Sequence, residues 1–183
     1  KEYRRQRQMC KETDLGSWIA RRAAIIPDHP ALTFDGETFT FAEFQRRIDL
    51  LAERLVDGGV AHGDRVAYLG PNHSAFLVAL FACARAGATF VPLNFRLTGP
   101  ELAYILDDCG ATTLIADASL TGVVDDVRAD IDVQRFIAVG GADGWENFDD
   151  VLASGVPVAD PVFADAEDVA VIMYTSGTTG LSL

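Results

Sequence analysis

The chain has 183 residues, of which 49% are hydrophobic and 23% charged, a balance typical of a folded globular domain and unlike that of a disordered chain. Its 15 basic and 27 acidic residues give a formal net charge of −12. This charge argues against a nucleic-acid-binding protein, because phosphates require a basic surface. The most apolar stretch, residues 75–84, is too short to span a membrane, which takes about 18 or more apolar residues.

The N-terminal residues differ in charge from the rest of the chain. Residues 1–11 hold five basic residues and one acid, Glu2. We expect residues 1–13 to form a basic arm that is either a solvated tail or a weak contact with an anionic membrane surface. No apolar signal segment follows the arm, and the three cysteines have no metal-site or disulfide spacing. These features predict a cytoplasmic protein, with peripheral membrane contact as an open alternative.

The first part of the chain predicts a helix, a β-hairpin and a second helix. Asp35-Gly36 favours a tight turn between two strands. Thr40 and Glu43 have the spacing of a capping box at the start of a helix. The expected elements are a helix over 14–26, strands over 31–34 and 38–40, and a helix from Thr40 to Gly58.

The rest of the chain predicts strands that alternate with helices. The strands are short, continuous apolar runs, typical of a parallel sheet that is buried on both faces. The expected fold class is therefore α/β: a mostly parallel sheet flanked by helices, preceded by the N-terminal helix and β-hairpin. The strands are expected at 65–69, 88–91, 112–115, 135–139 and 168–174, and the helices at 74–86, 99–108, 120–129 and 145–153.

A run of six glycine, serine and threonine residues, 175–180, follows the last of these strands. Glycines let a backbone approach a ligand closely, while exposed N–H groups and hydroxyls donate to phosphate oxygens. Ligands of open α/β sheets bind beyond the carboxyl ends of the strands. The alternative, a flexible linker, fits less well because the run follows a buried-strand pattern. Neither GxxxxGK[ST] nor GxGxxG occurs in the chain.

The segment from Tyr174 to Leu181 resembles the ATP phosphate loop of the adenylate-forming superfamily. That superfamily comprises acyl-CoA synthetases, peptide-synthetase adenylation domains and luciferases of the same fold. The resemblance spans residues 14–181 and implies the N-terminal portion of that enzyme fold. Arg96-Leu97-Thr98 is most similar to bacterial fatty-acyl-CoA synthetases, the long-chain fatty-acid–CoA ligases. Further segments that match in kind and order are Thr38–Phe44, Gly63–Ala67, Ala86–Asn94 and Leu102–Asp108.

The resemblance implies a two-step reaction. ATP and a fatty acid give an acyl-adenylate and pyrophosphate, and coenzyme A then takes the acyl group. Mg²⁺ is the expected metal cofactor, and no catalytic or metal-ligating residue is assigned within the chain. By the resemblance, the residues that grip the β- and γ-phosphates are Thr175, Ser176, Gly177, Thr178, Thr179 and Gly180.

The chain departs from the family pattern at its last two residues. The pattern continues Pro-Lys-Gly after Leu181, whereas this chain reads Ser182-Leu183. We therefore expect residues 14–183 to be a truncated N-terminal AMP-binding domain that ends in the phosphate loop and is inactive alone, with weak or no binding of ATP and coenzyme A. Two alternatives stay open: a remnant that associates with itself or a partner, and a small nucleotide-binding module. His29, His62 and His73 are expected to be isolated turn or surface residues.

Overall fold

The computed structural model describes residues 15–155 and 168–175. The basic arm, Asp14 and residues 176–180 of the expected phosphate loop lie outside these ranges. The elements in chain order are η1 (Leu15–Ser17), α2 (Trp18–Ile25), β1 (Pro30–Phe34), β2 (Glu37–Thr40), α3 (Phe41–Asp57), β3 (Arg65–Leu69), α4 (Ser74–Ala86), β4 (Thr89–Leu93), α5 (Gly99–Cys109), β5 (Ala111–Asp117), η2 (Ala118–Leu120), α6 (Thr121–Asp125), η3 (Arg128–Asp130), β6 (Arg135–Val139), β7 (Glu146–Asn147) and α7 (Phe148–Ala153).

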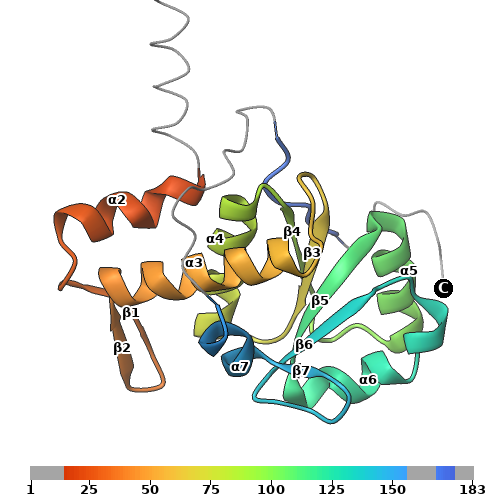
Figure 1. Cartoon of the computed structure of the whole chain (residues 1–183). Coiled ribbons are helices and arrows are strands. Elements are labelled where there is room, and N and C mark those ends of the chain that lie inside the picture. Colours follow the sequence, from red (N-terminus) through yellow and green to blue (C-terminus); the bar gives the residue numbers. More distant parts are fainter. Residues whose placement is uncertain (1–14, 156–167, 176–183) are drawn as a thin grey trace, which may run out of the picture.

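The main sheet has five strands in the order β4-β3-β5-β6-β7, and every neighbouring pair is parallel. Helices α3, α4 and α7 cover one face, and α5 and α6 cover the other (Figure 1). Within β3, Val66 and Tyr68 belong to the first core, whereas Ala67 and Leu69 belong to the second. Both faces of the sheet are therefore apolar, which explains the continuous apolar strands. The expected α/β class is confirmed.

The β-hairpin β1–β2 and the start of α3 form as expected. Asp35 and Gly36 both have positive φ, +47° and +81°, the backbone that a two-residue hairpin turn requires. The Thr40 hydroxyl accepts from the Glu43 N–H at 3.2 Å, and the Glu43 carboxylate accepts from the Thr40 N–H at 2.8 Å. This reciprocal pair is the predicted capping box, and it lowers the pKa of Glu43. It fixes the point where the hairpin passes into the long helix.

Three expected elements differ from those in the structure. The helix expected over 120–129 is broken into η2, α6 and η3, because Gly122 and the adjacent Asp125 and Asp126 are weak helix formers. The helix expected from Trp145 begins only at Phe148. Its cap is Asn147, whose side chain accepts from two backbone N–H groups, and the residues before it form β7.

The third difference concerns the expected strand 168–174. It shrinks to a single bridge between Val171 and Phe90 of β4. Its side chains are not buried on both faces: Val169 and Met173 are exposed, whereas Ile172 packs against the core shared with α5. The segment therefore lies at the edge of the sheet beside β4. One of its faces packs against the core, and the other is exposed.

Several features of the described residues bear on what the chain can contact. Within 15–155 and 168–175, no helix is both long enough and apolar enough to cross a membrane. Cys83 and Cys109 are free and buried, as their apolar surroundings predict.

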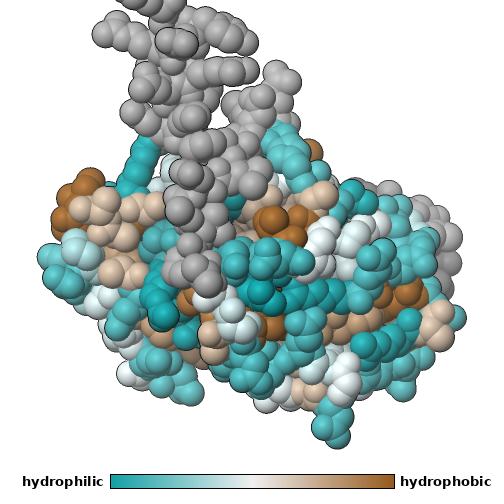
Figure 2. Space-filling view, in the orientation of Figure 1, coloured by the Kyte–Doolittle hydropathy of each residue, from teal (hydrophilic) through white to brown (hydrophobic). Residues whose placement is uncertain are grey.

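Figure 2 shows hydrophobic surface at the end of α2, where Ile25 is 73% exposed. Patches of this kind are candidates for contact with other protein surfaces.

Candidate functional site

The residues that lead into the expected phosphate loop, 168–175, are held against the edge strand β4. The Phe90 N–H donates to the Ala170 carbonyl, and the Ile172 N–H donates to the Phe90 carbonyl, both at 3.0 Å. The Thr89 hydroxyl donates to the Val169 carbonyl at 2.8 Å. The segment therefore runs parallel to β4 at the beginning of that strand.

A contact between side chains far apart in sequence holds the start of this segment. His62, in the loop before β3, lies 2.9 Å from Asp168, between imidazole Nε2 and carboxylate Oδ2. His62 lies in a turn at the surface, as expected, and the pairing adds a contact that no sequence pattern indicates. His62 is half exposed, and its partner gives it a role in placing the segment rather than in binding a metal. Among the described residues, no group of three histidine, cysteine or carboxylate side chains could hold a metal ion.

A second side-chain contact holds the end of the segment. The Tyr174 hydroxyl donates to Oδ2 of Asp108, in the last turn of α5, at 2.5 Å. Burial raises the pKa of the Tyr174 phenol above its ordinary value, and the bond to Asp108 raises it further. The phenol therefore stays a donor in neutral and mildly alkaline solution. Thr175, the first residue of the expected loop, comes directly after this anchor.

The expected loop begins directly after this anchor. Asp108 lies near the C-terminal end of α5, which leads into the amino end of β5. The hydroxyl of Tyr174 therefore lies beside the last turn of α5. Of the six expected phosphate-binding residues, Thr175 is described and exposed. Ser176, Gly177, Thr178, Thr179 and Gly180 lie outside the described residues, so their role stays a prediction.

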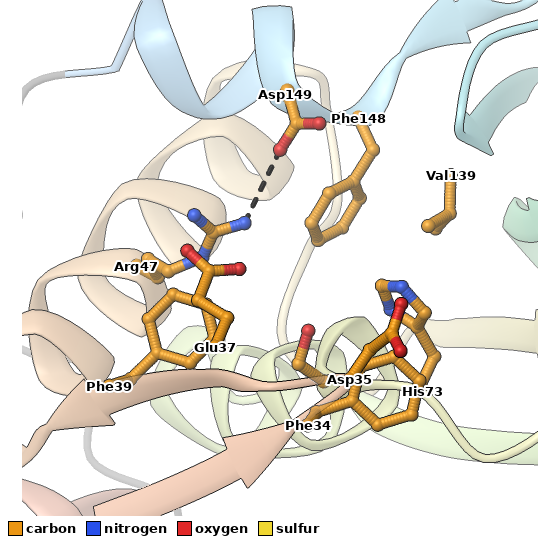
Figure 3. Close-up of a pocket in the computed structure, with 10 residues that line it drawn as sticks. Phe34, Asp35, Glu37, Phe39, Arg47, His73, Val139, Phe148 and Asp149 are labelled. Atoms are coloured by element: carbon orange, nitrogen blue, oxygen red, sulfur yellow. Dashed lines mark hydrogen bonds and ion pairs between the residues drawn. The ribbon is translucent and has the colours of Figure 1, made fainter.

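A separate cavity of about 400 Å³ lies between the hairpin, α3, α7 and the start of α4 (Figure 3). The carboxylates of Asp35, Glu37 and Asp149 lie at it. Its guanidinium, Arg47, is already paired with Asp149 at 3.3 Å. The ring of His73 accepts from the Ala75 N–H through Nδ1 and so caps α4. This excess of carboxylates does not suit a triphosphate. No sequence pattern indicates the cavity, because its lining comes from distant segments.

Comparison with known proteins tests the family resemblance that the loop motif carries. The family model described as "AMP-binding enzyme" matches residues 19–182. The chain belongs to the AMP-binding enzyme family. The resemblance to adenylate-forming enzymes is thereby confirmed, and the parallel sheet is the N-terminal portion of their fold.

Several relatives of the chain within the AMP-binding family are CoA ligases. Feruloyl-CoA synthase of an Amycolatopsis species is 45% identical over 168 residues, which cover 91% of this chain and 31% of that enzyme. Long-chain-fatty-acid–CoA ligase FadD13 of Mycobacterium tuberculosis is 33% identical, covering 89% of this chain and 33% of that enzyme. The inhibitor-bound crystal structure of the N-terminal domain of FACL13 from Mycobacterium tuberculosis superposes with a TM-score of 0.82 at 32% identity, covering 91% of this chain and 42% of that chain. The chain thus spans about a third of the length of these curated relatives.

Proposed function

We propose that residues 14–183 form the N-terminal part of an AMP-forming carboxylate–CoA ligase. The observation that carries the proposal is the phosphate-loop motif 175–180, which directly follows a segment anchored at both ends on an AMP-binding fold. The reaction joins ATP and a carboxylate into an acyl-adenylate with release of pyrophosphate. The thiol of coenzyme A then displaces AMP from the acyl group.

The chemistry assigned to the loop is stabilisation of the leaving pyrophosphate. Backbone N–H groups of its glycines and hydroxyls of Thr175, Ser176, Thr178 and Thr179 are donors without bulk, which suits the crowded oxygens of a triphosphate. Mg²⁺, which arrives with ATP, supplies further neutralisation of phosphate charge when bound. The described residues provide no metal cluster of their own, so the proposal gives them no role in holding the ion.

Two observations bear on the carboxylate substrate. The sequence run Arg96-Leu97-Thr98 favours a fatty acid by its resemblance to fatty-acyl-CoA synthetases. The identity of 45% to a feruloyl-CoA synthase and of 37% to an indoleacetate–CoA ligase favours an acid that carries an aromatic ring. Because 45% exceeds the 33% shared with the long-chain fatty-acid ligase, we place the aromatic acids first.

Formation of CoA thioesters from a panel of acids tests this assignment. The panel contains ferulate, indoleacetate, octanoate and palmitate, each with ATP, Mg²⁺ and coenzyme A, and uses a full-length ligase that carries these residues. We expect thioester and AMP in equal amounts, at the highest kcat/KM for an aromatic acid. Preference for palmitate would restore the fatty-acid assignment, and ADP in place of AMP would contradict the ligase chemistry.

The 183-residue chain by itself is expected to form no thioester above a blank, because it spans only about a third of the relatives' length. Self-association remains the alternative, and the exposed side chains of Trp18, Ile25 and Met173 favour it. Sedimentation velocity of the isolated chain separates the two, because a monomer at all concentrations contradicts the association module. Contact of the basic arm with a membrane surface likewise stays a proposal.

A further inference from the structure

We propose that Asp108 is a positioning residue for the phosphate loop, which it holds through Tyr174 at the point where the chain leaves the edge of the sheet. The proposal rests on the function proposed above, because it assigns Asp108 a part in orienting the same loop. Asp108 would touch neither ATP nor the carboxylate. It would act through the hydroxyl of Tyr174, one residue before Thr175.

The pairing between the segment and β4 ends where the next partner residue is a proline. Phe90 pairs with the segment through both its N–H and its carbonyl. The next residue of β4 that faces the same edge is two positions on, Pro92, because backbone groups alternate along a strand. Proline has no N–H, so the ladder bond that would accept at the Ile172 carbonyl cannot form. Pairing therefore ends after Ile172.

Two contacts of Tyr174 hold the chain beyond the paired residues. Tyr174 packs its ring against the core that lines α5 and donates its hydroxyl to Asp108. Met173, between the ladder and the anchor, is 72% exposed and contributes little burial. The bond to Asp108 and the packing of the ring thus hold the chain one residue before Thr175.

Asp108 lies in a helix turn that hydrogen bonds hold rigidly. Helix α5 ends at Gly110, whose φ of +62° is the left-handed backbone of a C-cap. Arg65 donates from Nε to the Cys109 carbonyl at 2.6 Å and from Nη2 to the Gly110 carbonyl at 2.9 Å. These bonds tie the end of α5 to the start of β3. A side chain on this turn is held well enough to position another segment.

The position of Asp108 in its own helix does not favour a carboxylate. A carboxylate in the last turn of a helix lies at the negative end of the helix dipole, where it destabilises the helix. Asp107 next to it shares this unfavourable place and has no bond to Tyr174, so it is a matched control. If neither carboxylate contacts another segment, neutralising either one should stabilise α5. If Asp108 anchors Tyr174, the change at Asp108 alone should also raise amide exchange at Ile172.

Amide hydrogen exchange on the whole 183-residue chain tests the anchor. We expect Asp108→Ala and Tyr174→Phe each to raise exchange at the Ile172 amide about tenfold, because the segment is then held at one end. Asp107→Ala should leave it unchanged, and Asp108→Asn should retain most of the protection, since an amide oxygen still accepts from the phenol. Equal exchange in the Asp108→Ala and Asp107→Ala variants overturns the proposal.

A second readout follows the phenol directly. Absorbance of the phenolate at 295 nm should show Tyr174 ionising at a lower pH in Asp108→Ala than in the unchanged chain, because removing Asp108 removes one of the causes that raise its pKa. Tyr174→Phe identifies which part of the signal belongs to this residue. A titration curve that Asp108→Ala leaves unaltered contradicts the hydrogen bond itself.

The role in orienting the loop is tested in a full-length ligase that carries these residues. Asp108→Ala and Tyr174→Phe should raise the KM for ATP about tenfold, whereas thioester formation from added acyl-adenylate should keep its rate. Loss of amide protection with an unchanged KM for ATP would make the anchor structural only and sink the proposal. An unaltered ligase without carboxylate-dependent pyrophosphate exchange would instead sink the proposed function, while the exchange data still report on the anchor.

Discussion

Replacing Arg85 by alanine is expected to lower the free energy of unfolding by about 3–5 kcal/mol, the cost of leaving a buried charge without its partner. Arg85 of α4 is 8% exposed, and its Nε lies 2.5 Å from Oδ1 of Asp49 on α3. Asp49 is 15% exposed and also accepts from the Gln45 amide at 2.8 Å. The pair joins the two helices that cover one face of the sheet, so chemical denaturation should show the loss directly.

The controls separate burial from charge pairing. Arg47→Ala removes a partly exposed pair with Asp149 and a contact over the Phe39 ring, and it should cost about 1 kcal/mol. The double variant Asp49→Leu with Arg85→Met replaces the pair by apolar groups and should cost less than about 1 kcal/mol. A loss for the double variant as large as that for Arg85→Ala would contradict the account, because the penalty would then come from packing.

The pH dependence of the Arg85→Ala variant gives an independent check. Burial raises the pKa of Asp49 and outweighs the opposing effects of Gln45 and Arg85. A carboxyl whose pKa is higher in the folded than in the unfolded chain contributes stability below its unfolded pKa, and that contribution is lost as the pH rises through the folded pKa. The penalty of Arg85→Ala should therefore be smaller at pH 4 than at pH 7.

Phe90→Ala is expected to cost about 3–5 kcal/mol, because it opens a cavity in the core beneath α4. Phe90 is 1% exposed and packs edge-on against Phe76, with ring centroids 5.1 Å apart, and more loosely against Tyr68. Phe95→Ala, five residues along the chain, removes a side chain that is 45% exposed and should cost less than about 1 kcal/mol. Thermal unfolding of the two variants measures the difference.

The Phe90→Ala variant also separates side-chain packing from the backbone ladder. The N–H and carbonyl of residue 90, which bind the segment before the phosphate loop, remain in the variant. The free energy of unfolding should therefore fall. The exchange protection of the Ile172 amide should stay unchanged relative to that of the amides of β4. Selective loss of protection at Ile172 would mean that the ring of Phe90, rather than its backbone, holds the segment.

The elements that sequence reasoning placed correctly are those fixed by local chemistry. Strands 65–69 and 135–139 and helix 74–86 have the expected bounds because each is a continuous apolar run with a clear stop signal. The capping box at Thr40 and the turn at Asp35-Gly36 depend on residues within four positions of one another. The order of the strands, β4-β3-β5-β6-β7, was not predicted, because no local signal carries it.

The features that sequence reasoning missed depend on residues distant in the chain. Strand pairing of residues 168–174 fails after Ile172 because of Pro92 in another strand. The anchors at Asp168 and Tyr174 lie 106 and 66 positions from their partners, His62 and Asp108. The buried pair between Asp49 and Arg85 is likewise invisible before α3 and α4 are packed together. Local patterns could not reveal any of these contacts.

Isotope exchange between labelled pyrophosphate and ATP tests the central claim most directly, because it reports adenylation without coenzyme A. The measurement uses a full-length ligase that carries these residues, with and without the preferred carboxylate, and compares it with its Thr178→Ala variant. We expect exchange only when the carboxylate is present, and a loss of about 100-fold in the variant, the usual cost of one donor to developing charge. Absence of exchange, or equal exchange in the variant, would contradict the assignment of residues 175–180 as the phosphate loop of an adenylate-forming ligase.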